Sequence, residues 1–331
     1  MRWLVALLLL AGGAGHTSPL FEDDGILEVT LEGPLSKAID DTERRDEHPF
    51  SLTVEGTRLD VVVRVRGISR AQVCQFPPLR LDFSSIDTSA TVFSGQRRLK
   101  LVTHCKKTAS YEQNVLEEYA AYRIFNALSD VSFRVRLLRV RYIDTRKPDK
   151  DALLRYAFLI ESKEALAERN EGTLVKPRRV TKNYLDDTQT GLAYIFQYLI
   201  GNTDWGLVRA IDADICCHNG VIVGIEGRHF YVPYDFDRAG LINARYAKPD
   251  PTLRIRKVTQ RRYRGYCMAD NAIRDALRVV VGHQDTILGI MTALGALTGQ
   301  ELEESSEYVR SFFEVAADEE KLLREFEKRC L

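Results

Sequence analysis

Three residues between positions 200 and 240 have the types and the order that metal-dependent phosphoryl transfer requires: Asp204, Asn219 and Asp235. This chemistry needs one carboxylate to orient the attacking group, and a second carboxylate with an amide oxygen to hold Mg²⁺ against the phosphates of ATP. Oxygen ligands suit such a hard cation. Asp204 is therefore the candidate catalytic group, and Asn219 and Asp235 are candidate metal ligands.

The elements around these residues are expected to bring them together. Apolar stretches at 220–225 and 229–232 predict a β-hairpin. Asn219 opens its first strand and Asp235 follows its second, so both fall at the same end of the hairpin, within reach of one ion. Asp204 follows a predicted helix end and is expected to face them. Asn and Asp are also common turn residues, but the ordered set of three favours a site.

Two further features of this segment bear on the site. Asp204 and Asn219 lie 15 positions apart (219 minus 204), so for both to belong to one site the intervening loop must bulge away while its ends converge. Asp237, which follows Asp235 closely, is another carboxylate that can approach the metal. We therefore add Asp237 to the candidate metal ligands.

The N-terminal part of the chain contains short apolar or alternating stretches, which are typical of strands in a sheet. A polar run over 40–48 is expected to be an exposed loop. Apolar positions three and four apart over 111–128 predict one helix. The predicted strands cover 26–31, 59–66, 79–83, 99–103, 133–142 and 156–160.

Beyond residue 161 the pattern becomes helical. Helical stripes cover 192–199, 269–281, 284–297, 303–314 and 318–329. This order predicts an α+β fold of two lobes. Residues 16–161 would form an N-terminal lobe with an antiparallel sheet and one helix, and residues 162–331 a mainly helical C-terminal lobe. A small ligand is expected in the cleft between them.

Specific motifs resemble the spore-coat-protein-H kinase family, a divergent secreted branch of the protein-kinase-like fold. They are GNTDW at 201–205, HN at 218–219 and VPYDFD at 232–237. The stretch RVRGIS at 64–69 and Arg80-Leu81 are similar to weaker family motifs, and the likeness covers roughly residues 55–265. The resemblance implies a bilobal protein-kinase-like fold that binds ATP with Mg²⁺ or Mn²⁺.

The resemblance also implies roles for single residues. Asp204 matches the catalytic aspartate of the family, and Asn219 and Asp235 match its metal-binding asparagine and aspartate. Lys100 resembles the strand lysine that contacts the α and β phosphates, and Glu118 resembles its ion-pair partner.

Several basic residues are candidates for the phosphate contacts. The segment before Lys100 has no glycine-rich loop of the G-x-G-x-x-G type, so Arg64 and Arg66 are expected to contact phosphate instead. Many family members have a lysine just before the Arg80 strand, where this chain has two prolines. Arg80 therefore remains the alternative to Lys100 as the main phosphate ligand.

These features predict an exported ATP-dependent kinase that phosphorylates a hydroxyl of an exported protein or glycan. One alternative keeps the fold and changes the reaction to AMP transfer or another adenylation, since fold does not fix function. A second alternative is a non-catalytic envelope scaffold, a pseudokinase. The ordered set of Asp204, Asn219 and Asp235 argues against the scaffold.

The N-terminus predicts export. Residues 1–15 combine Arg2, an apolar run and a small-residue exit, which is typical of a signal peptide cleaved near His16. No later segment is long and apolar enough to cross a bilayer. We therefore expect a secreted or periplasmic protein without stable membrane insertion.

Six cysteines, at 74, 105, 216, 217, 267 and 330, agree with an oxidising compartment and predict disulfides. Six thiols allow 15 pairings, and the sequence does not choose among them. The triplet Cys216-Cys217-His218 could suggest zinc, but no second CxxC or HxxxH element completes a tetrahedral set.

Charge gives no indication of a nucleic-acid partner, because 47 basic and 47 acidic residues balance to a formal net charge of zero. Basic residues do cluster at 176–182 and 254–264. These clusters could hold phosphate or an acidic substrate, and for the first of them a solvated surface is the favoured interpretation.

Overall fold

Seven strands close into a barrel in the computed structural model, which describes residues 18–207, 216–297 and 299–331. Their order around the barrel is β1-β2-β3-β4-β5-β7-β6. The strands are β1 (Leu27–Gly33), β2 (His48–Val54), β3 (Thr57–Val65), β4 (Leu79–Asp82), β5 (Arg98–Val102), β6 (Val135–Asp144) and β7 (Leu153–Ile160). The predicted signal peptide lies outside the described residues.

The barrel corrects the predicted fold class. A bilobal protein-kinase-like fold with an antiparallel-sheet N-terminal lobe is wrong, because β1 pairs with β6 in parallel and closes the sheet. On its other edge β1 pairs antiparallel with β2, which begins at the end of the polar run predicted as a loop. Closure gives every strand of the barrel a hydrogen-bonded neighbour on both sides. In an open sheet, the two edge strands each leave one row of backbone groups unpaired.

Alternation along the strands separates an interior from an outer face. Val61, Val63 and Val65 of β3 point into the barrel and are almost fully buried. Phe158 and Ile160 of β7 instead belong to a second core, outside the barrel. The strands therefore have apolar residues on both faces where a helix covers them.

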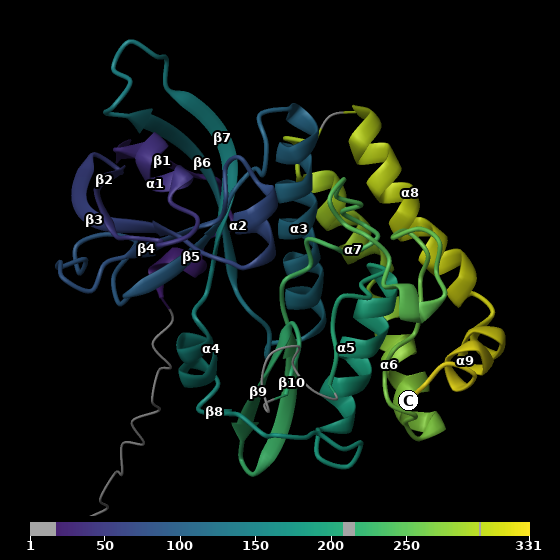
Figure 1. Ribbon diagram of the computed structural model, residues 1–331. Coiled ribbons are helices and arrows are strands. Elements are labelled where there is room, and N and C mark those ends of the chain that lie inside the picture. The colour runs from purple at the N-terminus through teal and green to yellow at the C-terminus, as the bar shows by residue number, and fades with distance from the viewer. Residues whose placement is uncertain (1–17, 208–215, 298) are drawn as a thin grey trace, which may run out of the picture.

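Helix α3 (Ala109–Leu128) provides that cover. It packs against β6 and β7 on one side and against α5 and α7 on the other. Figure 1 shows α3 between the barrel and the helices of the C-terminal part, α5 to α9. The other helices are α1 (Leu35–Asp40), α2 (Ser69–Val73), α4 (Lys163–Arg169), α5 (Asp187–Leu199), α6 (Asp270–Gly282), α7 (Gln284–Ala293), α8 (Gly299–Ala316) and α9 (Glu319–Glu327).

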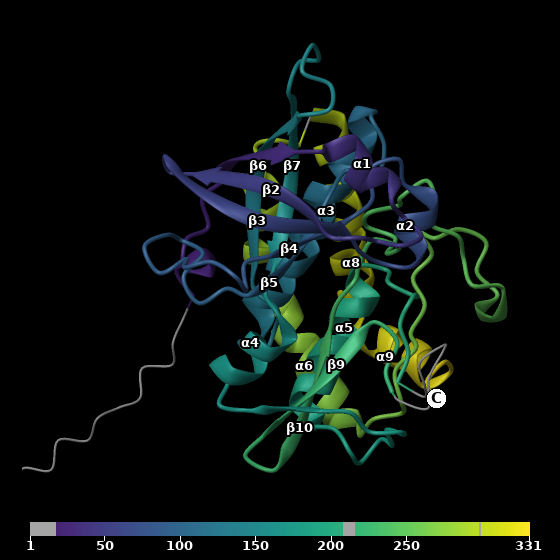
Figure 2. The same ribbon diagram turned by 60° about the vertical axis from the view of Figure 1, so that its left-hand side comes forward.

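A small antiparallel sheet lies apart from the barrel, at the other end of the molecule in Figure 2. It consists of β8 (Thr173–Val175), β9 (Gly220–Ile225) and β10 (Arg228–Pro233). The β9–β10 hairpin was predicted from the sequence, and its register pairs Gly220 with Pro233. The proposed boundary between two lobes at residue 161 stays a prediction.

Disulfides join all six cysteines: Cys74–Cys105, Cys216–Cys217 and Cys267–Cys330. They agree with the oxidising setting predicted from cysteine number and are compatible with a secreted protein. Within the described part of the chain, no helix is both long and apolar enough to span a bilayer.

The Cys267–Cys330 disulfide is expected to be the largest covalent contribution to stability. It closes a sequence separation of 63 residues, so replacing both cysteines by serine should lower the free energy of unfolding by about 4 kcal/mol through chain entropy. Urea unfolding under non-reducing conditions measures this. The Cys216→Ser/Cys217→Ser variant is the control, because its disulfide joins adjacent residues and closes almost no loop; equal losses in both variants would contradict the prediction.

Candidate functional site

Asp204 lies in a tight turn that follows α5. The helix ends at Leu199, and Gly201 two residues later adopts a left-handed φ of 64°; a Cβ there would come within 2.0 Å of the Tyr308 hydroxyl. Asn202 then accepts a hydrogen bond from the Asp204 amide at 2.9 Å. Trp205 donates back to the Asn202 carbonyl at 3.1 Å and is buried. The turn therefore holds the Asp204 backbone in one position.

Asp204 contacts His218 and Asn219, which precede β9, and Arg238, which follows β10. His218 Nε2 lies 2.9 Å from Asp204 Oδ1. Asn219 donates its amide to the Asp204 carbonyl at 2.6 Å, and the same nitrogen is 3.3 Å from Oδ2. Arg238 Nε is 3.7 Å from Oδ2. The structure thus brings Asp204 and Asn219 into direct contact, as expected.

These contacts set the ionisation of Asp204. Burial raises its pKa, but the hydrogen bond with His218 and the charges of His218, Arg238 and Arg264 more than offset burial and hold the pKa below the ordinary value. Asp204 is therefore a carboxylate at neutral pH, able to accept a proton.

The ends of the loop between Asp204 and Asn219 converge, as expected for two residues of one site. Gly206 and His218 exchange two backbone hydrogen bonds, at 3.1 and 2.9 Å, so the ends of the loop converge. Residues 208–215 lie outside the described part. His218 entered the sequence analysis through the HN motif and the zinc alternative, and its contact with Asp204 was not predicted.

Asn219 and Asp235 lie at the same end of the hairpin, as predicted. The Tyr234 amide donates to the Asn219 carbonyl at 3.2 Å, which extends the β9–β10 pairing by one residue. Asn219 and Asp235 both have left-handed backbones, with φ of 52° and 66°. The Tyr122 hydroxyl on α3 accepts the Asp235 amide hydrogen at 2.9 Å. Left-handed non-glycine residues are uncommon and concentrate at functional sites.

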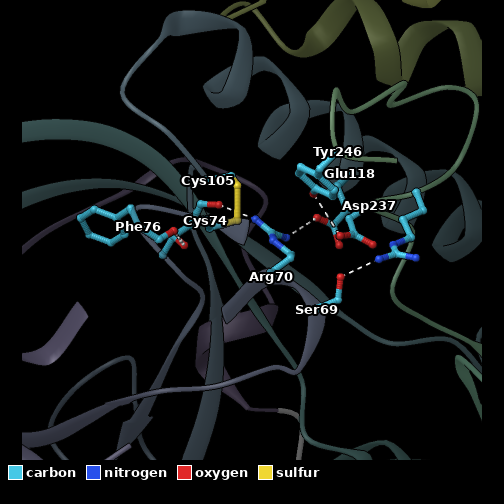
Figure 3. Close-up of a disulfide and its surroundings, with 10 residues drawn as sticks. Ser69, Arg70, Cys74, Phe76, Cys105, Glu118, Asp237 and Tyr246 are labelled. Carbon is cyan, nitrogen blue, oxygen red and sulfur yellow. Dashed lines mark hydrogen bonds and ion pairs between the residues drawn. A yellow bond between two sulfur atoms is a disulfide. The ribbon is translucent and has the colours of Figure 1, made fainter. Parts of the chain in front are cut away.

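Asp237 is buried beside a cluster of charges drawn in Figure 3. Its Oδ2 accepts a hydrogen bond from the Tyr246 hydroxyl at 3.0 Å. Burial, and then repulsion from Asp235, raise the pKa of Asp237 to about 6, against the opposing charges of Arg70 and Arg238. Asp235 therefore lies close enough to disfavour ionisation of the Asp237 carboxyl.

Arg70 balances these carboxylates. Its Nη1 lies 3.2 Å from Glu118 Oε2 on α3, in an ion pair that is almost fully buried. Its Nη2 donates to the Thr103 carbonyl at 2.6 Å. Burial raises the pKa of Glu118, and Arg70 opposes this rise, whereas Asp237 and Asp235 add to it.

Glu118 therefore has a partner that the sequence analysis did not foresee. In the described residues its ion pair is with Arg70 of α2, and not with Lys100 as the family resemblance implied. Arg70 directly follows the RVRGIS stretch, which was read only for its phosphate-facing arginines. Arg238, which directly follows Asp237, was also not predicted as a site residue. It lies 3.7 Å from Asp204 and donates a hydrogen bond to the Ser69 hydroxyl at 2.6 Å.

A disulfide fixes the position of α2. Cys74 follows the last residue of this helix and is bonded to Cys105, in the loop between β5 and α3. The Phe76 amide donates to the Cys105 carbonyl at 3.0 Å. In Figure 3 the guanidinium of Arg70 lies between this disulfide and the carboxylates of Glu118 and Asp237. The covalent link therefore limits how far Arg70 can move from its partners.

Cations from the barrel line a nearby cavity of about 290 Å³. On neighbouring strands, Arg64 is paired in register with Arg80, and Arg80 with Lys100. Phe133, Val221 and Tyr234 supply apolar wall. The cations of the lining are Arg64, Arg66, Arg80, Arg98, Lys100 and Lys163. The structure thus brings four predicted phosphate ligands, Arg64, Arg66, Arg80 and Lys100, to one cavity.

The cavity cations differ in how far they are neutralised. Arg80 lies 2.5 Å from Glu47 and 3.7 Å from Asp82. Among the described residues, Arg64 and Lys100 have no carboxylate within ion-pair distance. Burial, and then the charge of Arg66, lower the pKa of Lys100 to about 8, although Asp235 acts in the opposite direction. The cavity therefore carries excess positive charge that an anion would compensate.

The residues expected to hold a divalent cation fit that role in part. The charge of Asp235 acts on Asp237, so both carboxylates lie in one region. The Asn219 side-chain nitrogen donates to the Asp204 carbonyl, which leaves the Asn219 side-chain oxygen as the atom able to bind a metal. Within the described ranges, no group of three or more His, Cys, Asp or Glu side chains is arranged to hold a metal ion. Two carboxylates and one amide oxygen are the donor set that a nucleotide-bound Mg²⁺ requires from a protein.

Comparison with protein-family models and with curated proteins gives no match for this chain.

The Arg70–Glu118 ion pair is expected to be critical for stability. Arg70→Met leaves a buried carboxylate without its partner and should lower the free energy of unfolding by about 3–5 kcal/mol. In the double variant Arg70→Met/Glu118→Leu the loss should be well below the sum of the two single losses, because both charges are removed together. Urea unfolding of all three variants measures the coupling.

The matched control is Arg58→Met, which removes an arginine from the exposed ion pair with Glu32. Exposed pairs contribute only about 0–1 kcal/mol. Additive losses at Arg70 and Glu118, or a loss at Arg70 no larger than that at Arg58, would contradict the prediction.

Proposed function

We propose that this protein transfers the γ-phosphoryl group of ATP to a hydroxyl group of an exported protein or glycan, with Mg²⁺ or Mn²⁺ as cofactor. The proposal rests on one observation: a cavity lined by cations lies next to a cluster of acidic groups. Lys100 Nζ lies 4.9 Å from the ring centroid of Tyr234, which lines the cavity and directly precedes Asp235. The charge of Asp235 in turn contributes to the raised pKa of Asp237. Arg238 then interacts with both Asp237 and Asp204.

The cavity suits the nucleotide. Phosphate groups require cationic donors, and Arg64, Arg66 and Lys100 line one wall. Phe133, Val221 and Tyr234 offer apolar surface for a base or ribose. A volume of about 290 Å³ lies near the lower limit for a small-molecule site. In this proposal Lys100, between the arginines and Asp235, contacts the phosphates nearest the metal.

Asp235, Asp237 and the Asn219 amide oxygen would hold the divalent cation. When bound, the cation neutralises phosphate charge and fixes the orientation of the triphosphate. The raised pKa of Asp237 supports this assignment, since repulsion from Asp235 contributes to it and a cation between the two would relieve that repulsion. Arg70 and Tyr246 keep Asp237 in place in this scheme.

Asp204 would orient the acceptor hydroxyl. The hydroxyl oxygen forms a bond to the γ-phosphorus while the bond from that phosphorus to the β,γ-bridging oxygen breaks, and ADP leaves with the electron pair. The hydroxyl proton passes to the Asp204 carboxylate. His218 and Arg238 restrict the carboxylate to one orientation through the contacts at 2.9 and 3.7 Å. Their charges keep it ionised, ready to take that proton.

Replacing Asp204 or Asp235 by Asn is expected to reduce transfer from γ-labelled ATP at least a hundredfold, because each change removes a negative charge that the reaction uses. The readout is labelled phosphate on the proteins and glycans supplied as acceptors, together with released ADP. Asp149→Asn, in an exposed loop, is the matched control and should keep full activity. Undiminished transfer in both site variants would remove the mechanism.

Two measurements separate the alternatives. In the transfer assay, an acceptor that carries label from α-labelled rather than from γ-labelled ATP would indicate AMP transfer. A thermal unfolding midpoint unchanged by ATP with Mg²⁺ would favour a non-catalytic scaffold, since a ligand that binds the native state must stabilise it.

The pKa of Lys100 predicts how the affinity for ATP depends on pH. With a pKa of about 8 in the free protein, its protonated fraction falls from about three quarters at pH 7.5 to about one tenth at pH 9. Phosphate binding favours the protonated form, so the Kd for ATP with Mg²⁺ should rise about eightfold over this range. Isothermal titration calorimetry measures the change. Lys100→Arg stays charged and should remove most of it; an unchanged pH dependence in this variant would exclude Lys100 as the titrating group.

A further inference from the structure

The segment that follows the candidate site, residues 245–264, is strongly basic. It contains eight arginines and lysines but one acidic residue, Asp250, which gives a net charge of +7 (8 minus 1) in a chain whose formal net charge is zero. Neither the cavity around Lys100 nor the proposed metal site uses these cations. They are Arg245, Lys248, Arg254, Arg256, Lys257, Arg261, Arg262 and Arg264.

Both ends of this basic segment are fixed next to the candidate site. At its start, the Tyr246 hydroxyl donates a hydrogen bond to Asp237 Oδ2 at 3.0 Å. At its end, Arg264 Nη1 donates to the carbonyl of Thr203, the residue directly before Asp204. The basic segment therefore begins beside a proposed metal ligand and ends beside the group proposed to orient the acceptor hydroxyl.

Contacts with α5 and α8 fix the path of the basic segment between these ends. Arg261 Nε donates to the Leu199 carbonyl, at the end of α5, at 3.1 Å. The Arg261 guanidinium also lies 4.0 Å from the ring centroid of Tyr308 on α8, and the Tyr308 hydroxyl donates to the Thr259 carbonyl at 3.2 Å. The backbone that carries the cations is thus attached to the same two helices that surround the Asp204 turn.

Four cations in the middle of the basic segment are exposed, and we call them the loop cations. Among the described residues, none of the four has a carboxylate within ion-pair distance. The arginines of the later helices differ, since Arg274 pairs with Glu319 and Arg310 with Glu307. In Figure 2 the green loop that projects on the right, below α2, contains the residues near 250. The loop cations are Lys248, Arg254, Arg256 and Lys257.

A partner that neutralises the loop cations must be thin if it is also to reach Asp204. The Asp204 side chain is 29% exposed and lies between His218 and Arg238. A bilayer surface is flat and does not enter such a recess, whereas a single extended polypeptide chain does. Arginine guanidinium groups bind carboxylates through two parallel hydrogen bonds. An acidic polypeptide therefore fits both the charge of the loop and the shape of the site.

We propose that the loop cations bind an acidic stretch of the acceptor protein and so bring a neighbouring serine or threonine hydroxyl to Asp204. The role of Asp204 in this docking rests on the proposed function. The docking narrows the acceptor from an exported protein or glycan to a polypeptide with carboxylates beside the modified residue.

Binding is measured first, without ATP, by fluorescence anisotropy of labelled peptides with the full-length protein. A peptide of repeated Glu-Glu-Ser units should bind saturably, and one of Gln-Gln-Ser units at least tenfold more weakly. Affinity for the acidic peptide should fall as NaCl rises from about 50 to about 300 mM, because salt screens exposed charges. Equal binding of the two peptides would overturn the proposal.

Replacing three loop cations locates the binding. The variant Arg254→Gln/Arg256→Gln/Lys257→Gln should weaken binding of the acidic peptide about tenfold, since one exposed ion pair contributes little but three act together. All three side chains are exposed, so the thermal unfolding midpoint should stay unchanged.

The matched control is Arg146→Gln/Lys147→Gln/Lys150→Gln, which removes the same charge from three exposed positions of the loop between β6 and β7. That loop lies at the top of Figures 1 and 2, away from the basic segment. The affinity of this control for the acidic peptide should be unchanged. Equal weakening in both triple variants would show a general charge effect and reject the docking surface.

Transfer from labelled ATP to the acidic peptide separates the docking from the proposed function. The loop-cation variant should raise KM for the peptide about tenfold and leave kcat and the KM for ATP unchanged, because the loop cations take part in binding and not in the reaction. Transfer with an unchanged KM for the peptide would keep the kinase and reject the docking. Binding that depends on the loop cations, without any transfer, would keep the docking surface and reject the kinase.

Vesicles of phosphatidylglycerol test a membrane as the alternative occupant. Co-sedimentation of the unmodified protein but not of the loop-cation variant, without binding of the acidic peptide, would assign the loop cations to lipid and overturn the proposal.

Discussion

The structure around the candidate site depends on one buried guanidinium, that of Arg70. Glu118, Asp235 and Asp237 gather where the barrel meets α3 and the end of the β9–β10 hairpin, and their mutual repulsion in a desolvated place would oppose folding. Arg70 supplies the compensating charge at 3.2 Å from Glu118. The Cys74–Cys105 disulfide keeps its short helix beside the barrel, so a covalent link supports an electrostatic one.

A second arginine organises the other half of the site. Arg238 lies 3.7 Å from Asp204 and contacts Ser69, one residue before Arg70. The segment after Asp237 is also tied to the end of α5, through hydrogen bonds from Gly240 to Gly201 and from Leu241 to Ile200. Asp204 and the acidic pair at the hairpin are thus held in a common frame, with their negative charges shared between two arginines from different elements.

Local pattern was sufficient for most elements of the fold. Long periodic segments such as α3 and the β9–β10 hairpin were predicted with nearly correct bounds, and the hairpin placed Asn219 and Asp235 together. Barrel closure was not predictable in the same way. It rests on a parallel pairing of β1 with β6, whose first partners, Leu27 and Leu138, lie far apart in sequence. Short helices such as α2 also escaped, because five residues carry too little periodicity to be recognised.

The sequence by itself determined which residue types were present and which stood at the same end of a hairpin, because hairpin register follows from local alternation and turn chemistry. Only the tertiary structure decided that Glu118 pairs with Arg70 and that Arg64, Arg80 and Lys100 stand side by side on neighbouring strands. Pairing of buried charges depends on distances between elements remote in the chain, and a linear pattern carries no such distances.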